Sequence, residues 1–235
     1  MTGPRIALPA ALRRALPVAP TVWLAVAAIV LYAVLWVGHR QEWGWLETFD
    51  WGLLTPAHDI GIKHGGWVRF WVIVSFVLGP VPLRTLGFVA AVVMLVRRRY
   101  RMALLLLACA PLNGLVTWVA KSLAGRPRPA TALVAVPETS FPSGHALAAM
   151  AAVLALLTLA LPMVKRHLTR VVVIALSAVG VFTVGVARVA LNVHHPSDVI
   201  AGWALGFVYF VVLLWLCRPE SQPRDATGSQ PLLDP

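Results

Sequence analysis

The sequence predicts an all-α, polytopic membrane protein with six transmembrane helices and an interfacial helix. Of its 235 residues, 59% are hydrophobic and only 12% are charged, whereas a soluble domain has about 45–50% apolar and about 25% charged residues. Several apolar segments also exceed the roughly 18 residues that mark a membrane span. The net charge of +11 comes from basic clusters between apolar segments, which is typical of the positive-inside rule. We therefore expect a bilayer, and no nucleic acid, as the partner.

Hydropathy places the spans within residues 21–38, 82–96, 102–120, 144–163, 171–187 and 196–217. The first span lacks a signal-peptidase-like site after it, so we interpret it as retained. Residues 66–78 precede the second span and are separated from it by "LGPVP". Proline cannot continue a helix interior, so we expect an interfacial or half-inserted helix there. The alternative, a separate full span, would reverse the orientation of all later segments.

The basic clusters predict the orientation. They precede the first span, separate the second from the third and the fourth from the fifth, and follow the sixth. With six spans all four clusters lie on one side, so both termini are expected in the cytoplasm. We expect a cytoplasmic segment at 1–20, a membrane domain at 21–217 and a disordered cytoplasmic tail at 218–235. Residues 39–68 are too many for a tight turn and are expected to pack over the outer face.

Polar side chains gather where three separate stretches reach the outer ends of the spans. Ionisable groups at such places are costly unless they are paired or functional. Because the topology brings the three stretches to the same side, we expect them to form one site. Its candidate residues are Lys121, Arg126 and Arg128, then Ser143, Gly144 and His145, and finally Arg188, His194, His195 and Asp198.

The chemistry of these residues favours a phosphate ligand. Several cations meet two helix N-termini, which offer free N–H groups and a positive dipole end. Ser143 suits a helix cap, and the Gly144 N–H can approach a ligand closely. Asp198 follows His194 by about one helical turn and can orient its ring, leaving one nitrogen as a nucleophile. With His145 as proton donor, the pattern predicts phosphoryl transfer through a phosphohistidine.

Three motifs occur in order: "KSLAGRPRP" (121–129), "PSGH" (142–145) and "ARVALNVHHPSD" (187–198). They resemble K-x6-R-P, P-S-G-H and S-R-x5-H-x3-D of the type 2 phosphatidate phosphatase superfamily. One departure is Ala187, which stands where the family has serine, and we expect it to weaken one hydrogen bond. The resemblance implies a metal-free, cofactor-free phosphatase at the extracytoplasmic face of the cell membrane. It implies phosphate binding by Lys121, Arg128, Ser143, Gly144 and Arg188, with His145 as the acid, His194 as the nucleophile and Asp198 as its partner.

Fold-level analogy favours a polyprenyl (undecaprenyl or decaprenyl) diphosphate as the lipid substrate, because recycling that carrier requires hydrolysis on the outer face. Phosphatidate, phosphatidylglycerol phosphate and diacylglycerol diphosphate are alternatives. Other readings are a non-hydrolytic lipid-phosphate binder or transporter, a scaffold protein, and a haloperoxidase that holds vanadate in the same pocket. A metal site at His194, His195 and Asp198 is disfavoured by the nearby cations.

Two candidate residues lie outside the motif spacing. Arg126 is expected to be a solvated loop charge, and His195 is given a substrate-side or structural role. No obligate protein partner is expected.

Overall fold

The computed structural model describes residues 18–136 and 139–217, and within these ranges it consists of helices and connections without strands. The expected N-terminal segment and C-terminal tail therefore lie almost entirely outside the described residues. The helices are α2 (Val18–Arg40), α3 (Gly44–Lys63), α4 (Gly65–Val77), α5 (Pro80–Val96), α6 (Tyr100–Cys109), α7 (Asn113–Ala124), α8 (Gly144–Ala160), the short 3-10 helix η1 (Leu161–Met163), α9 (His167–Ala190) and α10 (Pro196–Leu216).

Six segments in the described part of the chain are long and apolar enough to cross a membrane, which confirms the six-span prediction. They are Pro20–Arg40, Gly65–Val96, Tyr100–Ala124, Gly144–Met163, His167–Ala190 and Pro196–Leu216.

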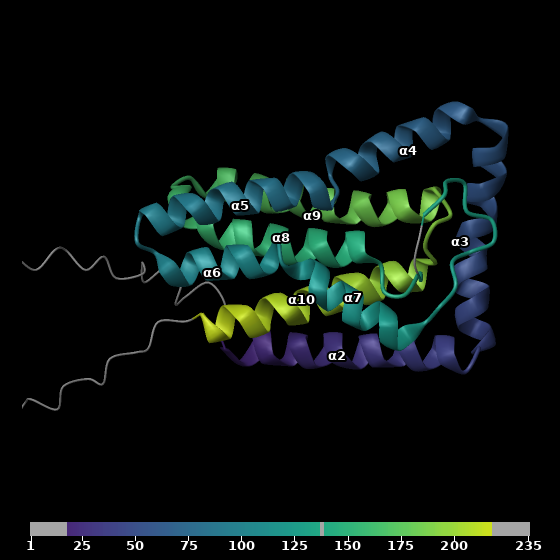
Figure 1. Cartoon of the computed structure of the whole chain (residues 1–235), viewed down its shortest axis with the longest axis horizontal. Coiled ribbons are helices and arrows are strands. Elements are labelled where there is room, and N and C mark those ends of the chain that lie inside the picture. The colour runs from purple at the N-terminus through teal and green to yellow at the C-terminus, as the bar shows by residue number, and fades with distance from the viewer. Residues whose placement is uncertain (1–17, 137–138, 218–235) are drawn as a thin grey trace, which may run out of the picture.

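The Gly65–Val96 segment bends where α4 meets α5, and α4 runs obliquely to the rest of the bundle (Figure 1). Gly79 lies at the bend, directly before Pro80 opens α5. A Cβ at position 79 would lie 2.1 Å from the carbonyl oxygen of Ser75. Only glycine fits such a close backbone approach. The helix is interrupted at "LGPVP", as the prolines predicted.

The third predicted span, at 102–120, lies within the apolar segment Tyr100–Ala124, but this segment consists of two helices. Helix α6 ends at Cys109 and α7 begins at Asn113, with Pro111 between them. Proline lacks the N–H that a continuing helix needs and its ring clashes with the preceding turn. The break lets α7 run in a different direction from α6 (Figure 1).

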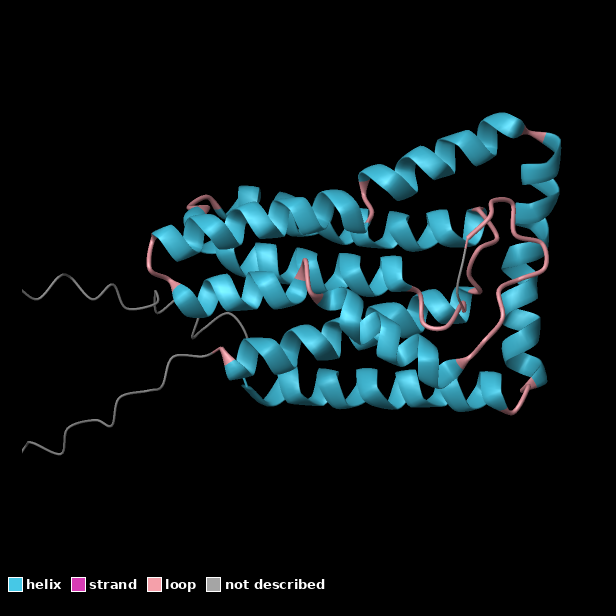
Figure 2. Cartoon of the chain, in the orientation of Figure 1, coloured by secondary structure: helices cyan, strands magenta, loops and turns pink. Residues whose placement is uncertain are grey.

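Helix α3 lies across one end of the bundle (Figure 1). This 20-residue helix occupies most of the segment that was expected to cover the outer face. The connection between α7 and α8 runs over the same end (Figure 2). The basic loops lie at the opposite end, with Arg97–Arg99 between α5 and α6 and Lys165–Arg166 before α9.

Helix α10 packs closely against the start of α8. A Cβ on Gly202 would lie 2.5 Å from the Ser143 carbonyl oxygen, and one on Gly206 would lie 2.6 Å from that of Leu147. Small residues allow two membrane helices to approach this closely. The first turns of α8 and α10 are therefore held side by side at the end that α3 covers.

Candidate active site

The predicted site residues all lie at the end of the bundle near α3. They are carried by the last turn of α7, the α7–α8 connection, the start of α8, the last turn of α9, the α9–α10 connection and the first turn of α10. The backbone N–H of Ser143 donates to the Asp198 carbonyl oxygen at 2.9 Å, which ties the starts of α8 and α10 together.

His194 lies at the centre of this group and is only 2% exposed. Its Nε2 is 3.2 Å from Arg128 Nη1, which also donates to the Val193 carbonyl oxygen at 2.6 Å. A guanidinium can only donate, so Nε2 is the acceptor and Nδ1 carries the proton of the neutral ring. Burial lowers the pKa of His194 to about 3; Asp198 opposes this shift, while Arg188 and Arg128 add to it. The ring is therefore neutral near pH 7, with a lone pair at Nε2.

Asp198 is shared between the two adjacent histidines. Its Oδ2 lies 3.6 Å from His194 Nδ1, which is longer than a hydrogen bond. The same oxygen accepts from the His195 backbone N–H at 2.8 Å and lies 3.2 Å from His195 Nδ1. His194 and Asp198 are thus neighbours, as predicted, but the shorter contacts of Oδ2 go to His195. The ring of His195 is buried against the edge of Trp51, which fits a structural role.

Two of the predicted cations are buried at the site. Lys121 donates to the carbonyl oxygen of Thr139 in the α7–α8 connection. Arg188 reaches across to α4, where its Nη1 donates to Ser75 Oγ at 3.0 Å, while its Nε is buried without a hydrogen-bond partner among the described residues. The preceding Ala187 is fully buried in α9. The oblique helix α4 therefore supports the guanidinium of Arg188.

Ser143 directly precedes α8, and Gly144 is the first residue of that helix. The Ser143 hydroxyl makes no capping hydrogen bond, and its Oγ is buried without a partner in the described part of the chain. A Cβ on Gly144 would lie 2.8 Å from Thr117 Cγ2 on α7. A side chain at position 144 would therefore press on α7, and the buried Ser143 hydroxyl is left with hydrogen-bonding capacity for a ligand.

His145 is the second residue of α8 and lies beside the α4–α5 bend. A Cβ on Gly79 would come within 3.4 Å of its Cδ2. Arg188, Arg128 and Arg84 are near enough to act on the ring electrostatically.

Arg84 was not among the predicted site residues. It lies in α5, and its Nη2 is 3.4 Å from Asn113 Oδ1 at the start of α7. The sequence could have indicated this residue, because an arginine inside an apolar span is rare and is a candidate functional position.

The expectation that Arg126 is a solvated charge was wrong. It is 8% exposed, and it donates to Asp198 Oδ1 at 2.7 Å and to Asp50 Oδ2 at 2.8 Å. Asp50 comes from α3 and was not predicted at all. A lone carboxylate among the apolar residues of "TFDWGLL" was its only signal.

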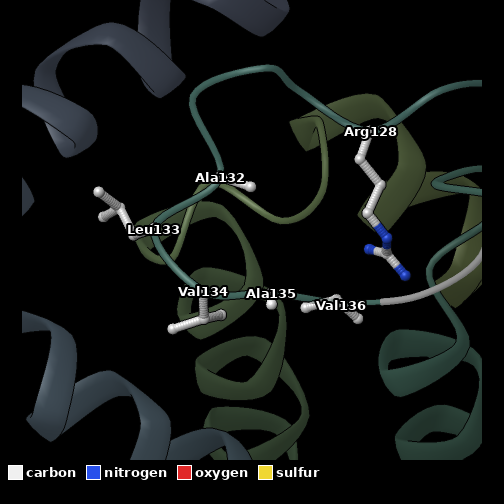
Figure 3. A pocket seen from close by; sticks show the side chains of 6 residues that line it. All are labelled: Arg128, Ala132, Leu133, Val134, Ala135 and Val136. Carbon is white, nitrogen blue, oxygen red and sulfur yellow. The ribbon is translucent and has the colours of Figure 1, made fainter.

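Two cavities adjoin these residues. One of about 650 Å³ lies beside residues 132–136 of the α7–α8 connection, and Arg128 extends its guanidinium toward it (Figure 3). The other, of about 260 Å³, lies between α2, α3 and residues 126–130, and its lining includes Asp50, Arg126, Arg128 and His195. Arg128 borders both cavities, so this cation is accessible from each.

Fold and site together describe a helical membrane protein with a buried, basic, histidine-containing centre. The sequence pattern of the PAP2 superfamily matches residues 101–222, more than half of the chain. The chain therefore belongs to the PAP2 superfamily, which confirms the resemblance. All three motifs fall within the matched region.

A sequence relative and a solved structure, both from Bacillus subtilis, are similar to this chain. Phosphatidylglycerophosphatase B of Bacillus subtilis (strain 168) is 37% identical over 114 residues, which are 47% of this chain and 55% of that protein. The match thus spans about half the length of this relative. The crystal structure described as the first transmembrane PAP2 type phosphatidylglycerolphosphate phosphatase from Bacillus subtilis aligns with a TM-score of 0.68 and 23% identity. The alignment covers 83% of this chain and 96% of that one, and it shows that the two share a fold.

Proposed function

We propose that this protein is a metal-independent lipid phosphatase that works through a phosphohistidine at His194. The observation that carries the proposal is the 3.2 Å contact between Arg128 Nη1 and His194 Nε2. This contact directs the Nε2 lone pair of the neutral His194 ring toward Arg128. A phosphate held by the Arg128 guanidinium would therefore lie next to the nucleophilic nitrogen. A lipid-phosphate binder or transporter would need the cations but not an oriented nucleophile, so hydrolysis is the better explanation.

The phosphate is bound by the cations of the site and by hydrogen-bond donors at the start of α8. Lys121, Arg128 and Arg188 supply positive charge that stabilises the equatorial oxygens of the transition state. The Gly144 N–H lies at the first position of α8, where backbone donors have no partner within the helix. The Ser143 hydroxyl adds a further donor.

The reaction proceeds in two displacements. His194 Nε2 attacks phosphorus as the bond from phosphorus to the lipid oxygen breaks, and His145 gives that oxygen a proton. Water then attacks the phosphohistidine, the bond from phosphorus to nitrogen breaks, and His145 takes the proton from the water. Asp198 stabilises the positive charge that develops on the His194 ring.

The first substrate to test is phosphatidylglycerol phosphate. The 37% identical relative is named phosphatidylglycerophosphatase B, which supports this choice. Polyprenyl diphosphate, which the sequence analysis favoured, and phosphatidate are the competing substrates. All three combine a terminal phosphate with an apolar tail.

We also propose that α3 and the site face the outside of the cell membrane, with both termini in the cytoplasm. The basic loops at the opposite end support this orientation through the positive-inside rule. A cysteine at Arg98, in a variant without Cys109 and Cys217, should react only with membrane-permeant reagents in intact cells. Labelling by an impermeant maleimide would show that the proposed orientation is wrong and that this loop faces the outside.

The deciding experiment measures phosphate release by purified protein in lipid nanodiscs with EDTA present. It compares the three lipids and uses His194→Ala as the blank. Release that persists in EDTA and disappears in the variant supports the proposal, and inhibition by vanadate, which resembles the transition state, supports the pocket chemistry. Equal release by His194→Ala would remove this residue as the nucleophile.

A further inference from the structure

Arg126 and Asp50 form a buried ion pair on the side of Asp198 that faces away from His194. Arg126 Nη2 donates to Asp50 Oδ2 at 2.8 Å, and Nη1 donates to Asp198 Oδ1 at 2.7 Å. Arg126 comes from the α7–α8 connection, Asp50 from α3 and Asp198 from α10. All three are buried, and removing one partner from such a group leaves an uncompensated charge. The group therefore holds three distant segments in a fixed arrangement.

Ser197 closes this arrangement into a ring. Its hydroxyl accepts from Arg126 Nη1 at 2.8 Å and donates to Asp50 Oδ2 at 2.6 Å. Its backbone N–H donates to Asp50 Oδ1 at 2.8 Å. This N–H lies in the first turn of α10, where free donors and the positive helix end favour a carboxylate. Asp50 thus caps α10 from another helix.

The contacts of Arg126 distinguish it from a phosphate ligand. Two carboxylates flank its single positive charge, and both of its Nη atoms donate within the ring. Arg128, two residues later, instead faces His194 Nε2. Because Arg126 holds Oδ1 of Asp198, the other oxygen, Oδ2, is turned toward His194 and His195.

We propose that Arg126 and Asp50 are positioning residues for Asp198, so that α3 belongs to the apparatus that orients His194. Arg126 fixes the rotation of the Asp198 carboxylate, and Asp50 fixes Arg126. The inference rests on the proposed function, since it concerns the turnover of His194. Residues that orient the histidine ligands of metal sites typically change activity about 10–100-fold when they are mutated, and we expect an effect of similar size here.

The test compares kcat and KM of Asp50→Asn and Arg126→Lys with wild type, using the best lipid in nanodiscs. Both changes nearly preserve size, but lysine lacks the planar fork that bridges two carboxylates. We expect kcat to fall about 10–100-fold in each variant. KM should stay within about threefold, since ground-state binding of phosphate is unchanged. Asp59→Asn, an exposed carboxylate on the same helix, is the matched control and should behave as wild type.

Other outcomes overturn the proposal. Unchanged kcat in folded Asp50→Asn and Arg126→Lys would show that the ring does not support turnover. A raised KM with unchanged kcat would make Arg126 a substrate ligand. If either variant fails to give a monodisperse protein, Ser197→Ala removes only the bridging hydroxyl and keeps every charge. It should lower kcat with KM unchanged, and full kcat in that variant would again refute the proposal.

A separate measurement covers the case in which the proposed function fails and wild type releases no phosphate. The melting temperature of the double variant Asp50→Asn with Arg126→Lys is compared with those of the single variants. Residues in one ion-pair network lose stability non-additively. A double variant no less stable than the worse single variant supports the ring, whereas fully additive losses overturn it.

Discussion

The two ends of the helical bundle are stabilised by different physics. At the end near α3, buried charges and hydrogen bonds connect α3, α8 and α10 through Asp50, Arg126, Ser143 and Asp198. Toward the opposite end, an apolar cluster that includes Leu106, Cys109, Ala151 and Phe210 fills the space between α5, α6, α8 and α10. The hydrogen bonds and ion pairs near α3 are directional, so they hold the side chains of the candidate site in a fixed geometry. The second region supplies packing, which tolerates substitution as long as volume is kept.

The largest expected difference between the two ends is in activity. His194→Ala should lower phosphate release by about 10⁴-fold or more, as loss of a nucleophile does in other enzymes, while the protein stays folded. His167→Ala, an exposed histidine at the opposite end, is the control and should keep full activity. Phosphate release and gel-filtration profiles of both variants measure the contrast.

At the apolar end, Leu106→Ala should lower stability and leave activity nearly unchanged, which is the opposite of the result expected for His194→Ala. Leu106 is fully buried in the cluster, and truncating a buried leucine costs about 2–5 kcal/mol through lost contacts and the cavity that remains. We expect a lower free energy of unfolding with kcat within about twofold of wild type, because the site is not touched. A large loss of kcat in protein that is still folded would show that the two ends are coupled.

Gly202→Ala should affect both stability and activity at the α3 end. The added Cβ would lie 2.5 Å from the Ser143 carbonyl oxygen and 2.9 Å from Ala146 Cβ. Overpacking of this kind costs about 1–3 kcal/mol, and it would displace the start of α8 that carries His145.

Gly180→Ala is the matched control for that change. A Cβ at position 180 in α9 would meet nothing within 4 Å. Alanine should therefore stabilise the helix by roughly 0.5–1 kcal/mol. Thermal unfolding should show a lower melting temperature for Gly202→Ala and a slightly higher one for Gly180→Ala. Equal changes in the two variants would contradict the packing argument.

A further expected effect concerns the pH dependence of stability. The pKa of His194 is lowered to about 3 in the folded protein, whereas the unfolded side chain titrates near its ordinary 6.5. As pH falls from 6.5 toward 3, the unfolded state binds a proton that the folded state does not. Folding stability should therefore fall with decreasing pH, by at most about 1.4 kcal/mol per pH unit from this group. Unfolding at pH 7, 6 and 5 should show a shallower dependence in His194→Asn; an unchanged dependence would contradict the prediction.

Much of the candidate site could be predicted because the residues that carry it sit at span ends. Once six apolar segments were counted, Lys121, Ser143, Arg188 and His194 had to lie at the same end of the bundle. The break at Pro111 was missed because hydropathy does not register a change of helix direction within an apolar segment. The predicted Ser143 cap was wrong, since the hydroxyl makes no hydrogen bond to the first turn of α8.

The sequence by itself determined the helical class, the number of spans and the motif residues, since hydropathy and spacing are local properties of the chain. Only the tertiary structure showed that Arg126 is buried between Asp50 and Asp198, partners that lie 76 and 72 residues away in sequence. It also showed that Asp198 divides its contacts between His194 and His195. Such contacts depend on how α3 folds back over α10, and no short-range pattern encodes the distance between two charges on separate helices.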